Sequence, residues 1–226
     1  MNLNLSFNDN VLSVILLSLE ISTTAIIIGI LIGIPIGALL ALTRFPGKRW
    51  IVALVYTCMG LPPVLIGVII YLMLSRYGPL GSLEWLFSPQ AMMMAQSILV
   101  TPIILGLTMS AVQAKEKLYT EALKSLGATP WQAAWTIIKE ARKGIFAGLG
   151  TAFGRAISEV GAVMLVGGNI EGHTRVMTTA IILETRMGNY PTALTIGFVL
   201  LAISFILNSF LVMGIIGNLR EERNYW

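Results

Sequence analysis

The segment from residue 11 to residue 42 constrains this chain most, because its 32 consecutive residues include only one charged side chain, Glu20. A helix of that length extends for about 48 Å at 1.5 Å per residue, which exceeds the roughly 30 Å hydrocarbon core of a bilayer. We therefore expect residues 11–20 to lie partly at a membrane interface and the remainder to cross the membrane.

The composition of the whole chain supports the same interpretation. Of its 226 residues 56% are hydrophobic and only 12% are charged, and the mean hydropathy is +0.81, values that a soluble domain does not reach. Four more apolar segments follow the first, at residues 51–74, 91–112, 144–167 and 192–217. The sequence predicts an all-α, polytopic membrane protein with five transmembrane helices, in a single domain that covers residues 1–226.

The residues that usually carry chemistry are almost missing from this sequence. It has one cysteine, Cys58, and one histidine, His173, and it contains no HExxH, GxSxG or P-loop pattern. The net charge of +4 comes without a basic run that includes aromatic residues, so we expect no nucleic acid partner. We expect no enzyme activity, no cofactor and no metal on this chain.

The lysines and arginines predict the orientation of the spans. Eleven of the 15 fall in the first and third loops and the C-terminal tail, whereas Arg76, Arg175 and Arg186 fall on the opposite side and Arg155 lies in the fourth span. Because cytoplasmic loops carry the excess of positive residues, the N-terminus is expected outside and the C-terminus inside.

A polar stretch, residues 121–142, separates the two apolar halves, and its residues have the pattern of two short helices joined by a turn. Gly127 suits the left-handed position that ends a helix, and Thr129 can serve as an N-cap with Pro130 at the first helical position. Gln132 completes a capping box with Thr129. The loop of about residues 113–143 is therefore predicted to be a cytoplasmic docking surface.

The same stretch resembles the EAA loop of permeases from ABC importers. Glu121-Ala122-Leu123 is followed by Gly127 four residues later and by Ile137 ten residues after that. The chain departs from the family pattern at Leu123, where alanine is preferred, and at Lys139-Glu140, where the family usually has Leu-Pro, so the second helix is free to continue toward Arg142. The resemblance implies an ATPase-docking set that comprises Glu121, Ala122, Leu123, Gly127, Ala128, Thr129, Pro130 and Ile137.

Residues 156–180, AISEVGAVMLVGGNIEGHTRVMTTA, resemble the oxyanion permeases of this class, most closely the tungstate branch, with molybdate and sulfate permeases as near relatives. The resemblance implies a type I ABC-importer permease fold in the inner membrane of a prokaryote. It also implies four kinds of partner: a second copy of the chain, two cytoplasmic ATP-binding subunits, an extracytoplasmic substrate-binding protein and membrane lipid. ATP hydrolysis would then occur on the separate subunits.

Two charged residues, Arg155 and Glu159, are predicted to lie four residues apart on one helix face in the fourth span. An unpaired charge at mid-membrane is costly, so they are expected either to form an internal ion pair or to place Arg155 along an anion pathway. The outer loop that follows offers Thr174 and Arg175 as further candidates. A stand-alone channel or secondary transporter would explain these charges equally well, but it would not need the docking loop.

Overall fold

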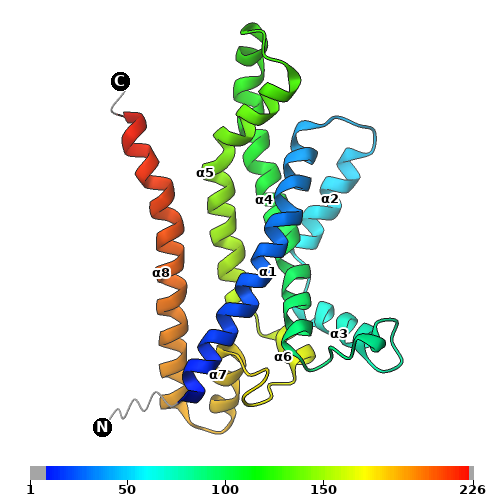
Figure 1. Ribbon diagram of the computed structural model, residues 1–226, viewed down its shortest axis with the longest axis vertical. Helices are drawn as coiled ribbons and strands as arrows, with labels where there is room; N and C mark the ends of the chain where they lie inside the picture. The colour runs from blue at the N-terminus through cyan, green and yellow to red at the C-terminus, as the bar shows by residue number, and fades with distance from the viewer. Residues whose placement is uncertain (1–8, 224–226) are drawn as a thin grey trace. The chain divides into compact units, whose positions relative to one another are not determined.

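The computed structural model describes the backbone of residues 9–223 and the side chains of residues 11–210. The predicted outer terminus at residues 1–8 and the last three residues of the tail lie outside this part. All regular elements in the described part are helical, as predicted (Figure 1). They are α1 (Asp9–Leu42), α2 (Lys48–Met59), α3 (Pro63–Leu74), the 3₁₀ turn η1 (Gly81–Leu83), α4 (Pro89–Ser125), α5 (Pro130–Ile157), α6 (Gly161–Gly167), α7 (Met177–Arg186) and α8 (Tyr190–Arg223).

Three helices, α1, α4 and α8, are each long and apolar enough to cross a membrane, and the number rises to five if each of two broken pairs counts as one span. The broken pairs are α2 with α3 and α5 with α6. The first break contains Pro62 and Pro63, whose missing backbone N–H groups interrupt the hydrogen bonds of the second span. The second break, after Ile157, was not predicted.

The described residues fall into two compact units, each made of three separate parts of the chain. Unit 1 holds residues 9–25, 62–96 and 156–204, and unit 2 holds residues 26–61, 97–155 and 205–223.

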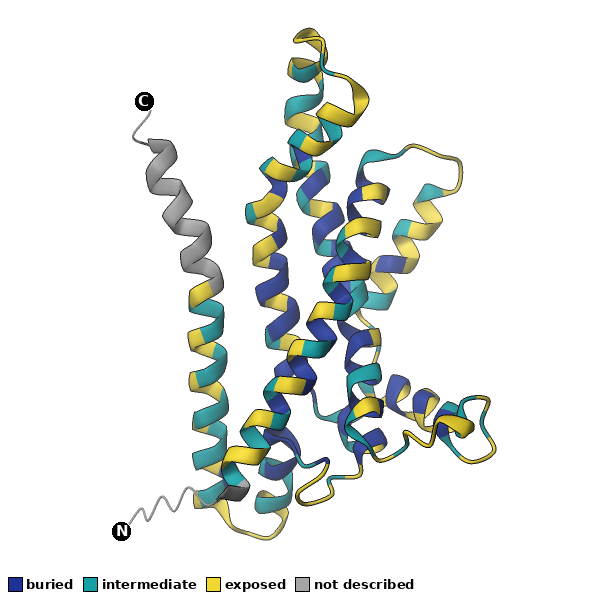
Figure 2. Cartoon of the chain, in the orientation of Figure 1, coloured by how far each residue is buried: buried dark blue, intermediate teal, exposed yellow. Residues whose placement is uncertain are grey.

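Unit 2 has an apolar core built from four helices, and Figure 2 shows its buried positions along the inner faces of α4 and α5. The core residues are Ala38, Leu40, Ala41, Val55, Leu105, Met109, Val112, Ile137, Ala141 and Ile145. The last three belong to the start of α5, so the core reaches close to the polar stretch that the sequence singled out.

Glycines on α1, spaced four residues apart, allow close contact with α4 in unit 2. A Cβ atom on Gly37 would lie 2.5 Å from the carbonyl oxygen of Leu105, and one on Gly33 would lie 3.1 Å from the backbone nitrogen of Leu105. On α5 the close contacts with α4 are made by Gly144 and Gly148, whose added Cβ atoms would lie 2.7 Å and 2.9 Å from the Cβ atoms of Ala111 and Leu107. Gly154, further along α5, has no comparably close neighbour.

In unit 1 the two short helices that follow the breaks, α3 and α6, pack against each other. A Cβ atom on Gly67 would lie 2.8 Å from the Cα atom of Ala162, and one on Gly161 would lie 2.8 Å from a methyl group of Val64. The backbone after each break is therefore covered by protein, which is the condition for irregular structure at membrane depth.

Candidate functional site

The polar stretch forms a helical hairpin whose two arms are the ends of long helices. The C-terminal part of α4 and the N-terminal part of α5 lie side by side and meet at Gly127 (Figure 1). The prediction of two short helices is therefore wrong in their length, because α4 arrives from the third span without a break and α5 continues beyond Arg142 to Ile157. With Lys139-Glu140 in place of Leu-Pro, nothing interrupts the hydrogen bonds of α5 there.

The first arm ends in a Schellman motif centred on Gly127. The N–H of Ala128 donates to the carbonyl of Leu123 over 3.0 Å, and the N–H of Gly127 donates to that of Lys124 over 3.0 Å. These are the two bonds that define the motif, and Gly127 takes the required left-handed conformation with φ of 74°. A Cβ atom at Gly127 would meet no atom within 4 Å, so the backbone angle alone makes glycine the suitable residue.

The second arm starts with the predicted capping box. The backbone N–H of Gln132 donates to Oγ1 of Thr129 over 3.3 Å, and the backbone N–H of Thr129 donates to Oε1 of Gln132 over 2.9 Å. Pro130 occupies the first helical position, where no N–H is needed. The turn is thus held at both helix ends by bonds that span five residues or fewer.

Large apolar side chains are exposed around the hairpin tip. Leu126 is 83% exposed and Trp131 is 80% exposed, and Glu121 and Ala122 are exposed as well. Apolar side chains grouped on a polar hairpin are typical of a surface that binds another protein.

One member of the predicted docking set is buried instead. Ile137 is 3% exposed and belongs to the core of unit 2, against which Leu123 also packs. Both residues therefore anchor the hairpin to the spans, and the structure corrects the placement of Ile137 on the docking surface. The sequence pattern could not separate the two roles, because an anchor and a contact residue at this position are both apolar.

The second polar site is the break between α5 and α6 in unit 1. Glu159 lies in the break, beyond the end of α5 at Ile157, and is buried, with 5% of its surface exposed. The prediction that Arg155 and Glu159 share one helix face is therefore wrong, since the helix has ended before Glu159. Whether the two charges pair stays a prediction.

Three side chains satisfy the backbone groups that the break leaves without helical partners. Oε1 of Glu159 accepts the N–H of Ala162 over 3.2 Å at the start of α6. Thr178 on α7 donates to the carbonyl of Glu159 over 2.9 Å, and Nε2 of Gln96 on α4 donates to the carbonyl of Ala156 over 3.1 Å. Buried donors and acceptors without partners are costly, so this polar cluster makes the break possible inside an apolar unit.

Gln96 and Thr178 were not identified from the sequence. A usable signal existed for Gln96, because it is the one amide in the apolar segment 91–112. Thr178 carries no such signal, since threonine occurs throughout the loop and its partner lies 19 residues earlier in the chain.

The two outer-loop candidates have different surroundings. Thr174 is fully buried, and its hydroxyl donates to the carbonyl of Gly167 over 2.5 Å and accepts the N–H of Ile170 over 2.9 Å. These bonds close the turn that follows α6. Thr174 therefore stabilises the loop and has no free polar atom for a ligand.

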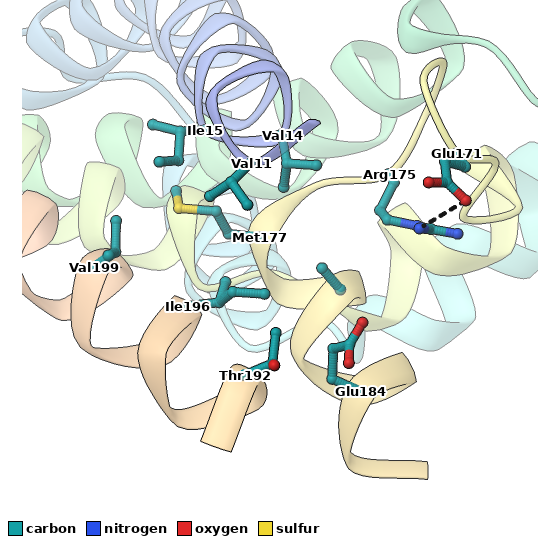
Figure 3. Close-up of a pocket in the computed structure, with 11 residues that line it drawn as sticks. Val11, Val14, Ile15, Glu171, Arg175, Met177, Glu184, Thr192, Ile196 and Val199 are labelled. Atoms are coloured by element: carbon teal, nitrogen blue, oxygen red, sulfur yellow. Dashed lines mark ion pairs between the residues drawn. The ribbon is translucent and has the colours of Figure 1, made fainter. Parts of the chain in front are cut away.

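Arg175 lies beside a cavity of about 170 Å³ in unit 1 (Figure 3). Its Nη1 atom lies 3.3 Å from Oε2 of Glu171, and Glu184 lies on the same side of the cavity. The opposite walls are apolar and come from α1 and α8, with Val11, Val14, Ile15, Ile196 and Val199. With two acids beside one arginine, the charged side of this cavity does not favour an anion.

Comparison with known proteins places this chain in one class, the permease components of binding-protein-dependent transport systems. Residues 33–220 match the family described as the inner membrane component of such systems, and this chain belongs to that family. The chain is a transport permease component with several membrane-spanning helices.

Individual relatives cover nearly the whole chain. It is 43% identical to the tungstate uptake system permease protein of Peptoclostridium acidaminophilum, over 98% of this chain and 95% of that protein. It is 39% identical to a probable anion ABC transporter permease protein of Haloferax volcanii, over 92% and 90%. An inward-facing structure of the MetNI methionine ABC transporter has the same fold, with a TM-score of 0.69 at 20% identity over 88% of this chain and 93% of that one.

Proposed function

We propose that this chain is the membrane-spanning permease of an ATP-driven importer that moves tungstate into the cell. The observation that carries this proposal is the 43% identity to a tungstate uptake permease over almost the full length of both chains. Molybdate and sulfate are the alternative cargoes, because their permeases are near relatives of the same class.

The exposed hairpin supports the proposal that this chain binds separate ATP-binding subunits. A second copy of this chain would complete the pathway, two ATP-binding subunits would bind the two hairpin tips in the cytoplasm, and an extracytoplasmic binding protein would deliver the anion. The exposed Leu126 and Trp131 are apolar contacts that such a subunit can cover. ATP hydrolysis then takes place on the partner subunit and not on this chain.

The mechanism follows from how firmly the hairpin is attached. Its arms continue without a break into α4 and α5, and its base is anchored in the core through Leu123 and Ile137. A displacement of the tip by an ATPase subunit would therefore move these helices and would not be absorbed by a flexible loop. We propose that this movement switches the pathway between outward-open and inward-open states.

The orientation proposed here has the N-terminus outside and both the hairpin and the C-terminus inside. It rests on the excess of lysine and arginine in the loops on one side. A cysteine introduced at the exposed Lys124, in a variant that lacks Cys58, should resist an impermeant thiol reagent in intact cells, whereas a cysteine at the exposed His173 should react. The opposite labelling pattern would reverse the orientation.

The test of the cargo is ATP hydrolysis by the reconstituted complex. The permease, its ATPase subunit and its binding protein are placed in proteoliposomes, and hydrolysis is measured with tungstate, molybdate or sulfate. Tungstate should stimulate hydrolysis at the lowest concentration. Equal or better stimulation by molybdate or sulfate would reassign the cargo, and tungstate uptake by the permease alone would point to a channel or secondary transporter.

A further inference from the structure

A groove of about 300 Å³ follows α5 in unit 2, where the polar hairpin passes into the apolar span. Its walls are apolar and consist of Ile34 from α1 together with Ile138, Ile145, Phe146 and Leu149 from α5. Three other side chains, Trp135, Lys139 and Arg142, line the end nearer the hairpin. The groove therefore has one long apolar part and one cationic end.

This division follows from the spacing of residues along the helix. Lys139, Arg142, Phe146 and Leu149 recur at intervals of three and four residues, which places them on one face of α5. Lys139 and Leu149 are ten residue steps apart, which is about 15 Å along the helix and half of the roughly 30 Å hydrocarbon core. From its cationic end to its apolar end, the groove thus has about the length of one membrane leaflet.

Among the residues whose side chains the structure describes, no acid lines the groove, and neither Lys139 nor Arg142 takes part in an ion pair. Trp135 is largely exposed at the same end, in the position typical of aromatic residues at the membrane–water interface. A suitable occupant would carry negative charge at one end and an apolar chain at the other.

We propose that this groove binds an anionic phospholipid of the leaflet that faces the hairpin. The phosphate lies between Lys139 and Arg142, where a guanidinium and an ammonium can both bind it, and one acyl chain lies against Phe146, Leu149 and Ile34. Because the groove adjoins the base of the hairpin, the bound lipid also stabilises the part of α5 that carries the docking surface.

Two other occupants fit the groove less well. A second copy of the chain, related by a two-fold axis through the groove, would place two pairs of cations opposite each other without an acid to separate them. A soluble ATPase subunit could approach Lys139 but would not cover Phe146 and Leu149, which lie in the apolar span.

The test measures lipid retention by the complete complex of permease and ATPase subunits, so it does not depend on which anion is transported. The complex is prepared in nanodiscs with equimolar phosphatidylglycerol and phosphatidylcholine, and the retained lipids are counted by native mass spectrometry. In the variant with Lys139→Gln and Arg142→Gln, the preference for phosphatidylglycerol should fall about 5-fold for each cation removed and roughly 25-fold for both.

Two control variants separate a site from general surface charge. The exchange of Lys139→Arg with Arg142→Lys keeps both charges and should keep most of the preference. Arg49→Gln with Arg76→Gln removes two exposed cations outside the groove and should leave the preference unchanged. Neither Arg49 nor Arg76 lines the groove. Equal losses of the phosphatidylglycerol preference in the two variants that remove charges would therefore overturn the proposal.

Two further results would also overturn it. One is unchanged phosphatidylglycerol retention in the variant without both groove cations. The other is efficient disulfide formation between two copies that carry Phe146→Cys in a background without Cys58, because the groove would then be an interface between copies. Failure of tungstate to stimulate hydrolysis would refute the proposed cargo and would leave the lipid measurement valid.

Discussion

The hairpin at Gly127 and the break at Glu159 both interrupt helices, but they are held by different kinds of interaction. At the hairpin the cap bonds join residues no more than five positions apart, as in the pair Thr129 and Gln132. At the break, Gln96 reaches a carbonyl 60 residues away in the chain, and Thr178 reaches one 19 residues away. The first turn is specified by its own sequence, and the second depends on the folded unit around it.

This difference gives the two sites different mutational signatures. Variants at the break should lose folded protein, because buried polar groups lose their partners. Variants at the hairpin should keep folded protein and lose the coupling of ATP hydrolysis to transport, because the turn lies in water and its orientation serves a partner.

Glu159→Ala should have the largest effect on folded protein. It removes the acceptor for the N–H of Ala162 inside unit 1, and bonds to charged groups contribute about 1.5–3 kcal/mol. Abundance in the membrane and thermal stability in detergent measure the loss. Glu159→Gln keeps an acceptor oxygen and should retain much more folded protein, and equal abundance of Glu159→Ala and wild type would show that the cap is unnecessary.

A charge exchange tests what else Glu159 does. If pairing with Arg155 were its main role, the double variant Arg155→Glu with Glu159→Arg would restore most of the folded protein that each single variant loses. Because arginine cannot accept the N–H of Ala162, we expect incomplete recovery of abundance. Full recovery together with uptake would assign Glu159 to pairing, whereas recovered protein without uptake would place Arg155 on the anion pathway.

Gln96→Leu should have the next largest effect, a loss of about 1–3 kcal/mol in stability. Leucine fills a similar volume but cannot donate to the carbonyl of Ala156, with which Gln96 now forms a buried hydrogen bond. The control is Gln90→Leu at an exposed position of the same helix, which should change thermal stability little. If both variants melt at the same temperature as wild type, the long-range cap contributes nothing measurable.

These two sites also show which parts of the structure the sequence could predict. Gly127, Thr129 and Gln132 act within one short segment, so their residue types and spacing were sufficient to predict the turn and its caps. The break after Ile157 has no proline, and Ala156 and Glu159 find their partners on other helices. The apolar segment 144–167 predicts one continuous helix. The side chains that make a break favourable, Gln96 and Thr178, come close to it only after folding.

The same limit explains the correction at Ile137. The resemblance to the EAA pattern implied a place in the docking set, but the pattern does not say which face of α5 the core covers. That face is decided by Met109, Val112 and the other core residues that α1, α2 and α4 contribute to unit 2. Exposed Trp131 and buried Ile137 are therefore distinguished only by the packing of α5.

Gly127→Val should have a smaller effect on stability and a large effect on transport. Valine strains the left-handed backbone at φ 74° by about 1–2 kcal/mol, and no neighbouring atom adds a clash. The protein should reach the membrane in normal amount but fail to couple hydrolysis to uptake. Gly127→Asn tolerates this backbone angle and should keep most activity, and poor abundance of both variants would contradict the local character of the turn.

Thr129→Ala should have the smallest effect, about 1 kcal/mol on the start of α5. It leaves the N–H of Gln132 to bond with water, which is possible because Thr129 is exposed. Hydrogen exchange of residues 131–133 should become faster while exchange in the core of unit 2 stays unchanged, and ATPase activity should depend on tungstate less steeply. Thr129→Ser keeps the cap oxygen and should behave as wild type.

The double variant Thr129→Ala with Gln132→Ala decides whether the capping box acts as a unit. The two bonds are reciprocal, so the loss from the double variant should be smaller than the two single losses added together. Abundance should remain normal throughout this series, in contrast to the variants at the break. A fall in abundance as large as that of Glu159→Ala would mean that the hairpin, too, is required for folding. The distinction between a locally specified turn and a break that depends on the folded unit would then no longer hold.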